Sequence, residues 1–272
     1  LQLGEVRSIT VDGRRIDFLP VARIAPESVN RAAKKLLRST TFQYVLGALR
    51  YRQAISRHIG REPASFDLHR FEFALFARSF GRPIIQMVHG EGRKSDPMDS
   101  LIKRYWFVHS LNERLALRFA DEILCVNQNI IERMKIEFPD AVARAHLHSV
   151  AVDTDIFKPA PFDVADGVFR FFFAGRLDDF KDPATIFRTL AQLRDKLNGK
   201  VAFHYIGTGD PARFPDYAAV SDLVVNQGFQ NAAGVAGIVS RCHAGVLTSF
   251  FEGMPCFLLE GLAAGQPFGA IR

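Results

Sequence analysis

Apolar residues alternate along the chain between two spacings. Short, mostly apolar runs over residues 83–88, 168–174 and 201–206 predict strands. Apolar positions three and four residues apart over residues 99–120 and 183–196 predict helices. Short apolar strands that alternate with helices indicate parallel sheets with helices on both faces. We therefore expect an α/β protein.

The same two spacings recur over most of the sequence. Further strands are predicted over residues 66–69, 122–126, 146–152, 222–225 and 244–248, and further helices over residues 72–78, 128–137, 231–240 and 256–264. Near the amino end, two short strands over residues 5–10 and 15–20 flank the turn signal at residues 11–14, which predicts a hairpin.

One stretch interrupts the alternation. Residues 153–167 contain two prolines, a glycine and few apolar residues, which is typical of a linker. A chain of 272 residues is long enough for two domains. We expect two Rossmann-like, doubly wound domains over residues 1–158 and 159–272, in which ligands bind at the carboxyl ends of the strands.

Composition excludes several classes of protein. With 48% hydrophobic and 24% charged residues, disorder, collagen and coiled coil are not expected. No apolar run approaches the roughly 18 residues of a membrane span. The three cysteines, Cys125, Cys242 and Cys256, show no zinc or disulfide spacing. A reducing compartment such as the cytoplasm is therefore expected.

Positive charge is concentrated in the first half of the chain. The net charge is +6, and residues 1–158 hold 25 Lys/Arg against 18 Asp/Glu, whereas the remainder holds 10 against 11. Residues 31–61 contain no acidic residue and interleave cations with apolar residues at helical spacing. This segment predicts peripheral contact with an anionic membrane or attraction of a phosphorylated ligand; the alternative is a solvated helix face. No nucleic-acid-binding motif accompanies the charge, so no nucleic acid partner is expected.

A first candidate site follows the strand over residues 168–174. The strand ends at Gly175, Arg176 follows, and Lys181 precedes a helix start at Asp182-Pro183. Two cations at the carboxyl end of a strand, next to a helix N-terminus, fit a diphosphate. The alternative is a pair of solvated cations in a loop.

A second candidate site contains two glutamates eight residues apart. Glu252 leaves a strand into a loop, and Glu260 lies on the following helix. The backbone amides of residues 253–255 can donate to an anion or a sugar hydroxyl. Carboxylates are acceptors for the vicinal hydroxyls of ribose or hexose.

Taken in order, these motifs resemble glycosyltransferase family 4, whose members are retaining enzymes with the two-Rossmann-domain fold called GT-B. The motifs are GRLDDFKD (175–182), YIGTGD (205–210) and SFFEGMPCFLLEGLAAGQP (249–267), together with VDTDIFKP (152–159), FDLHRFE (66–72) and VHG (88–90). The resemblance is strong from residue 152 onward and looser before it.

The resemblance implies a site for a nucleotide sugar. The donor-binding residues would be Gly175, Arg176, Lys181, Glu252, Gly253, Met254 and Glu260, and the catalytic residues Glu252, His89, Arg176 and Lys181. Arg176 and Lys181 would hold the diphosphate and stabilise its leaving charge, and Glu260 would accept from ribose hydroxyls. Glu252, the amides of Gly253 and Met254, and His89 would face the donor sugar. The alternative for His89 is a structural histidine in the core or at a cap. His69, Arg70 and Glu72 are candidates for the acceptor side or for structural roles.

Two other motifs are not expected to form sites. Asp153-Thr154-Asp155 matches the metal-binding D-x-D pattern but lies in the inter-domain signature, and the resemblance implies no catalytic metal and no cofactor. Gly207-Thr208-Gly209 lacks the third glycine of a dinucleotide fingerprint, which disfavours an oxidoreductase.

The sequence also departs from the family. The glycine-rich loop expected near the amino end is missing, and the chain stops at Arg272, so we expect a fragment or an abbreviated relative. The expected function is retaining transfer of a hexose from a UDP- or GDP-sugar to a saccharide or lipid-linked acceptor of the cell envelope. The alternative is a truncated, non-catalytic module that binds nucleotide sugars.

Overall fold

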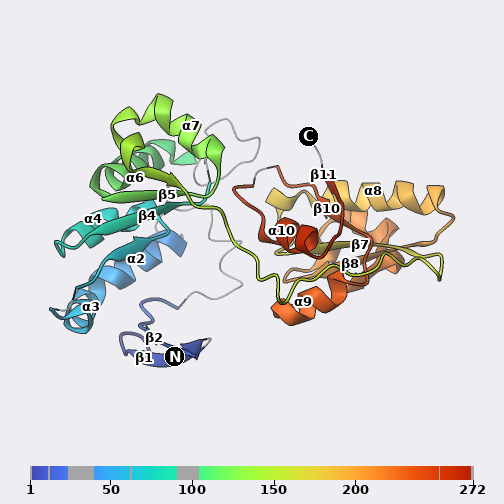
Figure 1. Ribbon diagram of the computed structural model, residues 1–272, viewed down its shortest axis with the longest axis horizontal. Helices are drawn as coiled ribbons and strands as arrows, with labels where there is room; N and C mark the ends of the chain where they lie inside the picture. Colours follow the sequence, from blue (N-terminus) through green and yellow to red (C-terminus); the bar gives the residue numbers. More distant parts are fainter. Residues whose placement is uncertain are drawn as a thin grey trace. The chain divides into compact units, whose positions relative to one another are not determined.

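The computed structural model describes residues 2–11, 13–23, 40–61, 63–90, 104–250 and 252–270. Its contacts divide the chain into two compact units, Leu1–Ser149 and Val150–Arg272 (Figure 1). The sequence predicted the boundary later, after residue 158. Each unit is described by itself below.

The first unit contains a hairpin and a parallel sheet. The hairpin pairs β1 (Arg7–Val11) with β2 (Arg14–Phe18) in antiparallel register, as predicted. The sheet has the order β3-β4-β5-β6, formed by β3 (Phe66–Leu68), β4 (Ile84–Val88), β5 (Glu122–Cys125) and β6 (Ala145–Leu147). All its strand pairs are parallel, which confirms the predicted sheet type.

The helices of the first unit match the predictions with shifted ends. They are α2 (Thr40–Arg50), α3 (Arg52–Ile59), α4 (Ala74–Arg78), α6 (Trp106–Phe119) and α7 (Gln128–Glu137), with 3-10 turns at Phe71–Phe73 and Pro139–Arg144. The basic segment 31–61 forms two helices over its described part, and residues 31–39 lie outside that part. The helix predicted over 99–120 is described from residue 104 onward. α7 begins where the Asn127 side chain accepts a hydrogen bond from the backbone N–H of Ile130 (3.0 Å).

The second unit is built on a five-stranded parallel sheet of order β11-β10-β7-β8-β9. Its strands are β7 (Phe169–Ala174), β8 (Val201–Ile206), β9 (Val224–Asn226), β10 (Ala244–Leu247) and β11 (Phe268–Ala270). The chain runs from β7 outward through β8 to β9, then returns to the other side of β7 for β10 and β11. The strand order therefore reverses between β7 and β10, and such a switch point is where open α/β sheets bind ligands.

Helices cover both faces of this sheet. They are α8 (Pro183–Lys196), α9 (Ala232–Val239) and α10 (Cys256–Ala263). Because crossovers between parallel strands are right-handed, α8 takes one face and α9 and α10 the other; Figure 1 shows α8 and α9 on opposite sides of β7 and β8. Phe172 and Phe203 of the sheet, Phe187 of α8 and Phe257 of α10 are buried between the layers. The doubly wound prediction is confirmed for this unit.

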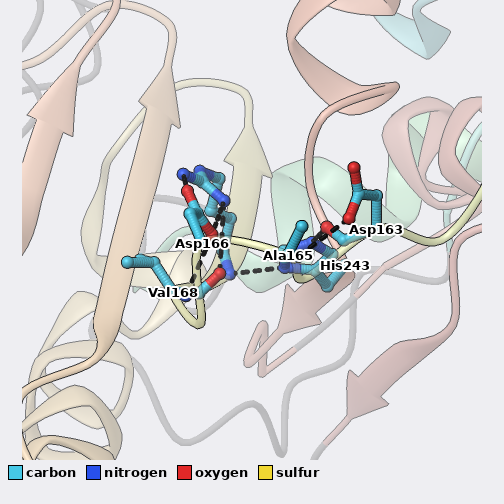
Figure 2. A network of polar contacts seen from close by, with 6 residues as sticks. Asp163, Ala165, Asp166, Val168 and His243 are labelled. Atoms are coloured by element: carbon cyan, nitrogen blue, oxygen red, sulfur yellow. Dashed lines mark hydrogen bonds and ion pairs between the residues drawn. The ribbon is translucent and has the colours of Figure 1, made fainter.

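The segment predicted as a linker is attached to the second unit. His243 accepts the backbone N–H of Arg170 at Nδ1 (2.8 Å), so its Nε2 carries the proton and donates to the carbonyl of Asp163 (2.6 Å) (Figure 2). Asp166 forms an ion pair with Arg170. These contacts hold residues 163–170 against the sheet of the second unit.

Two strands differ from the prediction. The strand expected over residues 146–152 is limited to β6, and β11 was not predicted. It follows Pro267, whose carbonyl accepts the N–H of Gly245 in β10 (2.8 Å).

Among the helices of the described ranges, none combines the length and apolar character needed to cross a bilayer.

Candidate functional site

Two loops meet at the switch point of the second unit. Residues 175–182 follow β7 and residues 248–255 follow β10, and neighbouring parallel strands end at the same edge of the sheet. The N–H of Phe250 donates to the carbonyl of Phe180 (3.0 Å), and the buried hydroxyl of Thr248 donates to the carbonyl of Lys181 (2.6 Å). Hydrogen bonds therefore join the two loops that carry most of the predicted site residues.

An ion pair connects these loops through their side chains. Lys181 Nζ contacts Glu252 Oε1, and the two side chains are only 23% and 20% exposed. Partial burial strengthens the attraction relative to a fully exposed pair. The structure thus brings together two predicted residues that lie 71 positions apart, each acting as the counter-ion of the other.

Arg176 is held differently from Lys181. Its Nε donates to Asp178 Oδ2 (2.7 Å), while 71% of its side chain is exposed. Its two terminal nitrogens have no partner in the described part of the chain. Asp178 Oδ1 is buried and also lacks a hydrogen-bond partner there. The carboxylate orients the guanidinium and leaves both terminal NH2 groups available for a bidentate contact with an anion.

Glycines allow the loops after β7 and β8 to approach closely. Gly175 and Gly207 have φ values of 149° and 154°, which side-chain-bearing residues rarely adopt. A Cβ on Gly207 would overlap the carbonyl oxygen of Gly175 and lie 2.8 Å from its carbonyl carbon. The N–H of Gly207 donates to the carbonyl of Gly228 (2.9 Å). The G-T-G motif therefore shapes this edge of the sheet.

α8 begins directly after this loop, as predicted. Asp182 adopts a left-handed conformation with φ 45°, and its side chain accepts the N–H of Thr185 (3.2 Å) as an N-cap. Pro183 occupies the first helical position. These two residues turn the chain sharply from Lys181 into the helix.

Glu260 lies on α10, the helix that follows the loop after β10. Its side chain is half-buried, and burial raises its pKa above the usual value. No cation pairs with it among the described residues. A carboxylate without a counter-ion can still accept hydrogen bonds, including those of hydroxyl groups. Gly253 and Met254, which precede α10, are half-buried at the same edge.

His89 lies in the first unit, at the carboxyl end of β4. Its Nε2 is 2.6 Å from Nδ1 of His69, which follows β3, and the two rings stack with centroids 4.9 Å apart. Asp67 Oδ2 lies 3.4 Å from Nε2 of His69. Partial burial and the neighbouring His69 lower the pKa of His89. Sequence analysis missed Asp67, although its D-x-H spacing at a strand end is a signal for such a pair.

The other candidates have local partners or none. Arg70 and Glu72 form an ion pair at 3.7 Å in the first unit. Within the described ranges, no ion pair joins Arg176 or Glu260 to another of the charged candidates. Asp153 accepts the N–H of Asp155 (2.9 Å) in a local turn. Over the same ranges, no group of three or more His, Cys, Asp or Glu side chains is arranged for a metal ion.

A family comparison and a structure comparison identify relatives of the chain. Residues 168–270 match the model of the family described as glycosyl transferases group 1. No curated protein sequence matches the chain. Many solved structures share its fold.

Three of these structures illustrate the likeness. Sucrose-phosphate synthase from Thermosynechococcus elongatus has a TM-score of 0.67 and 16% identity, covering 83% of this chain and 60% of that protein. A UDP-forming trehalose-phosphate synthase from Burkholderia xenovorans has a TM-score of 0.59 and 14% identity, with coverages of 84% and 63%. The lipopolysaccharide outer core galactosyltransferase WaaB has a TM-score of 0.55 and 20% identity, with coverages of 84% and 62%.

The chain spans less than two thirds of the length of each of these three relatives. At such low identity the likeness shows the fold, and the family match covers most of the second unit. The chain therefore has the GT-B fold, and its residues 168–270 match the model of the family described as glycosyl transferases group 1.

Proposed function

We propose that the complete protein transfers a hexose from a UDP- or GDP-sugar to an acceptor hydroxyl with retention of the anomeric configuration. The supporting observation is the contact between Lys181 and Glu252 beside Arg176, at the switch point of a glycosyl transferases group 1 domain. Cations and hydroxyl-binding carboxylates at one sheet edge match a ligand that contains both a diphosphate and a sugar.

The ion pair suggests how the donor is accommodated. A diphosphate carries more negative charge than one carboxylate, so it competes with Glu252 for Lys181. Release of Lys181 leaves the Glu252 carboxylate available to accept from hydroxyls of the donor sugar. Arg176 then donates hydrogen bonds to the diphosphate from its two terminal NH2 groups.

The same cations serve the chemical step. The bond between the anomeric carbon and the phosphate oxygen breaks, and the nucleoside diphosphate leaves with both bonding electrons. The acceptor oxygen forms the new bond on the face that the nucleoside diphosphate leaves, which retains the configuration, and its proton passes to the departing diphosphate oxygen. Fixed positive charges at Arg176 and Lys181 stabilise the charge that develops on the leaving group. Glu260, which lacks a counter-ion, would accept from the ribose hydroxyls of the donor.

The acceptor proposal rests on the relatives and on surface charge. One relative acts on lipopolysaccharide outer core, which supports a saccharide or lipid-linked acceptor of the cell envelope. The basic segment 31–61 supports peripheral contact with an anionic membrane on its cytoplasmic side. In its described part, Leu46 and Leu49 of α2 are 49% and 52% exposed beside Arg50, which is typical of an interfacial helix.

Calorimetric titration of the full chain with UDP and with GDP tests the proposed donor site. The double variant Arg176→Ala/Lys181→Ala should weaken binding of the preferred nucleotide at least tenfold. The matched control Lys200→Ala/Arg241→Ala removes two cations just before β8 and β10, at the opposite edge of the sheet, and should bind normally. If neither nucleotide binds, or if both variants bind like the unsubstituted chain, the proposed donor site is wrong.

A second candidate is a non-catalytic module that binds nucleotide sugars. It requires only the two cations of the proposed donor site, Lys181 and Arg176, and no group that acts on an acceptor. Release of UDP or GDP from the corresponding hexose donors distinguishes the two. Nucleotide release that depends on Lys181 supports the transferase, and binding without release supports the module.

A further inference from the structure

Three side chains form a line at the carboxyl ends of β3 and β4. β3 and β4 are neighbouring parallel strands with Leu68 opposite Gln86, so the residues that follow them share one edge of the sheet. His69 Nδ1 lies 2.6 Å from His89 Nε2, and His69 Nε2 lies 3.4 Å from Asp67 Oδ2. Among the described residues, the side chains of Asp67, His69 and His89 are all exposed, so a ligand can reach this edge of the sheet.

The distances determine where the protons lie. A nitrogen–nitrogen separation of 2.6 Å requires one proton between the two rings, because two facing N–H groups would repel. The Asp67 carboxylate favours a proton on Nε2 of His69, and the neutral His69 then has a lone pair on Nδ1. His69 therefore accepts, and His89 donates through Nε2–H. Nδ1 of His89 remains unprotonated, without a partner in the described part of the unit.

We propose that Asp67 and His69 are positioning residues that hold His89 as the neutral Nε2–H tautomer and present its Nδ1 as a hydrogen-bond acceptor. The tautomer assignment rests on the His69–His89 contact and on the nearby charge of Asp67. The ligand, a sugar hydroxyl, rests on the proposed function. A ring that is already oriented accepts such a hydroxyl without first losing rotational freedom.

The surrounding charges are consistent with a neutral His89. Partial burial of the ring and the nearby His69 lower the pKa of His89, and Asp67 opposes them more weakly. In the adjoining turn, Arg70 and Glu72 are paired with each other. From α6, His109 packs against Phe71 with ring centroids 5.8 Å apart. The lowered pKa favours the uncharged form of His89, which is the form that can accept a hydrogen bond.

NMR of the full chain, with 15N-labelled histidine, tests this arrangement directly. His89 should show a protonated Nε2 and an unprotonated Nδ1, and its titration midpoint should lie below the usual value of about 6.5. His69→Ala should shift the midpoint upward toward that value. His69→Asn should preserve the tautomer, because Asn Oδ1 can replace the imidazole Nδ1 as acceptor. Asp67→Asn should mix the two tautomers.

A matched control is His146→Ala, which removes an exposed histidine paired with Glu122 (2.7 Å) in the same unit and should leave His89 unchanged. An ordinary midpoint for His89 in the unsubstituted chain would overturn the proposal. So would an unchanged tautomer and midpoint in folded His69→Ala, or in folded Asp67→Asn if the alanine variant does not fold. Because the readout is a spectrum of the free protein, its result is separate from any failure of nucleotide binding.

Discussion

Replacing Gly207 by alanine tests whether the edge of the second sheet depends on close contact between two loops. Gly207 follows β8 with φ 154°, and its added Cβ would overlap the carbonyl of Gly175, which follows β7. The unusual φ angle and the overlap with Gly175 both involve backbone atoms, so rotating a side chain cannot relieve either of them. The loop after β7, which carries Arg176 and Lys181, must therefore move.

The expected loss combines two contributions. An alanine forced to positive φ costs about 1–2 kcal/mol. Displacing a packed backbone neighbour adds about 1–3 kcal/mol, the usual range for overpacking. Gly199 provides a control, since its φ is 76° and an added Cβ meets nothing within 4 Å. Gly199→Ala should lose only the first contribution.

Thermal unfolding followed by circular dichroism measures the difference. For a unit of this size, about 4 °C of melting temperature corresponds to 1 kcal/mol. Gly207→Ala should lower the midpoint of the second unit by about 8–20 °C, and Gly199→Ala by about 4–8 °C. UDP affinity should fall at least tenfold only in Gly207→Ala. Equal shifts in both variants, or unchanged UDP affinity in Gly207→Ala, would refute the reasoning.

Three further predictions concern single ionisable groups. The hydrogen bond from Arg170 lowers the pKa of Asp166 to about 2. The stability that the ionised Asp166 contributes is therefore complete above the usual carboxyl pKa and is lost as the pH falls through about 2. In urea unfolding, the difference between the unsubstituted chain and Asp166→Asn should therefore shrink from pH 5 to pH 2, and a constant difference would contradict this. Burial raises the pKa of Glu260, so its ionised form destabilises the folded chain at pH 7. Glu260→Gln should therefore raise the melting temperature of the free chain at pH 7 while weakening UDP binding. A lower melting temperature would contradict the predicted gain in stability. Burial also raises the pKa values of the Cys125 and Cys242 thiols to about 11 and about 12, so a thiol reagent should modify only the exposed Cys256 before unfolding, and rapid reaction of all three would be inconsistent with the fold.

Local patterns predicted most of the second unit. The strand over residues 201–206 and the helix over residues 183–196 have the predicted bounds, and Asp182 is the predicted N-cap. Each of these features depends on neighbours within a few positions in the sequence. The alternation of strands and helices also predicted a doubly wound sheet whose ligands bind at the carboxyl ends of the strands.

Contacts between distant residues could not be predicted in this way. The pairing of Lys181 with Glu252 and the bond from His243 to Asp163 join positions 71 and 80 residues apart. They depend on which strands become neighbours, which the local spacing does not determine. The orienting role of Asp178 was missed because a carboxylate two residues from an arginine is common on solvated loops.

The central claim is that the carboxyl edge of the second sheet binds a nucleoside diphosphate. Titration of the 15N-labelled full chain with UDP, followed by amide chemical-shift mapping, tests it most directly. The account predicts that the largest shifts fall in residues 175–182 and 252–260. Shifts concentrated around Lys200 and Arg241 at the opposite edge, or no shifts at millimolar UDP or GDP, would contradict it.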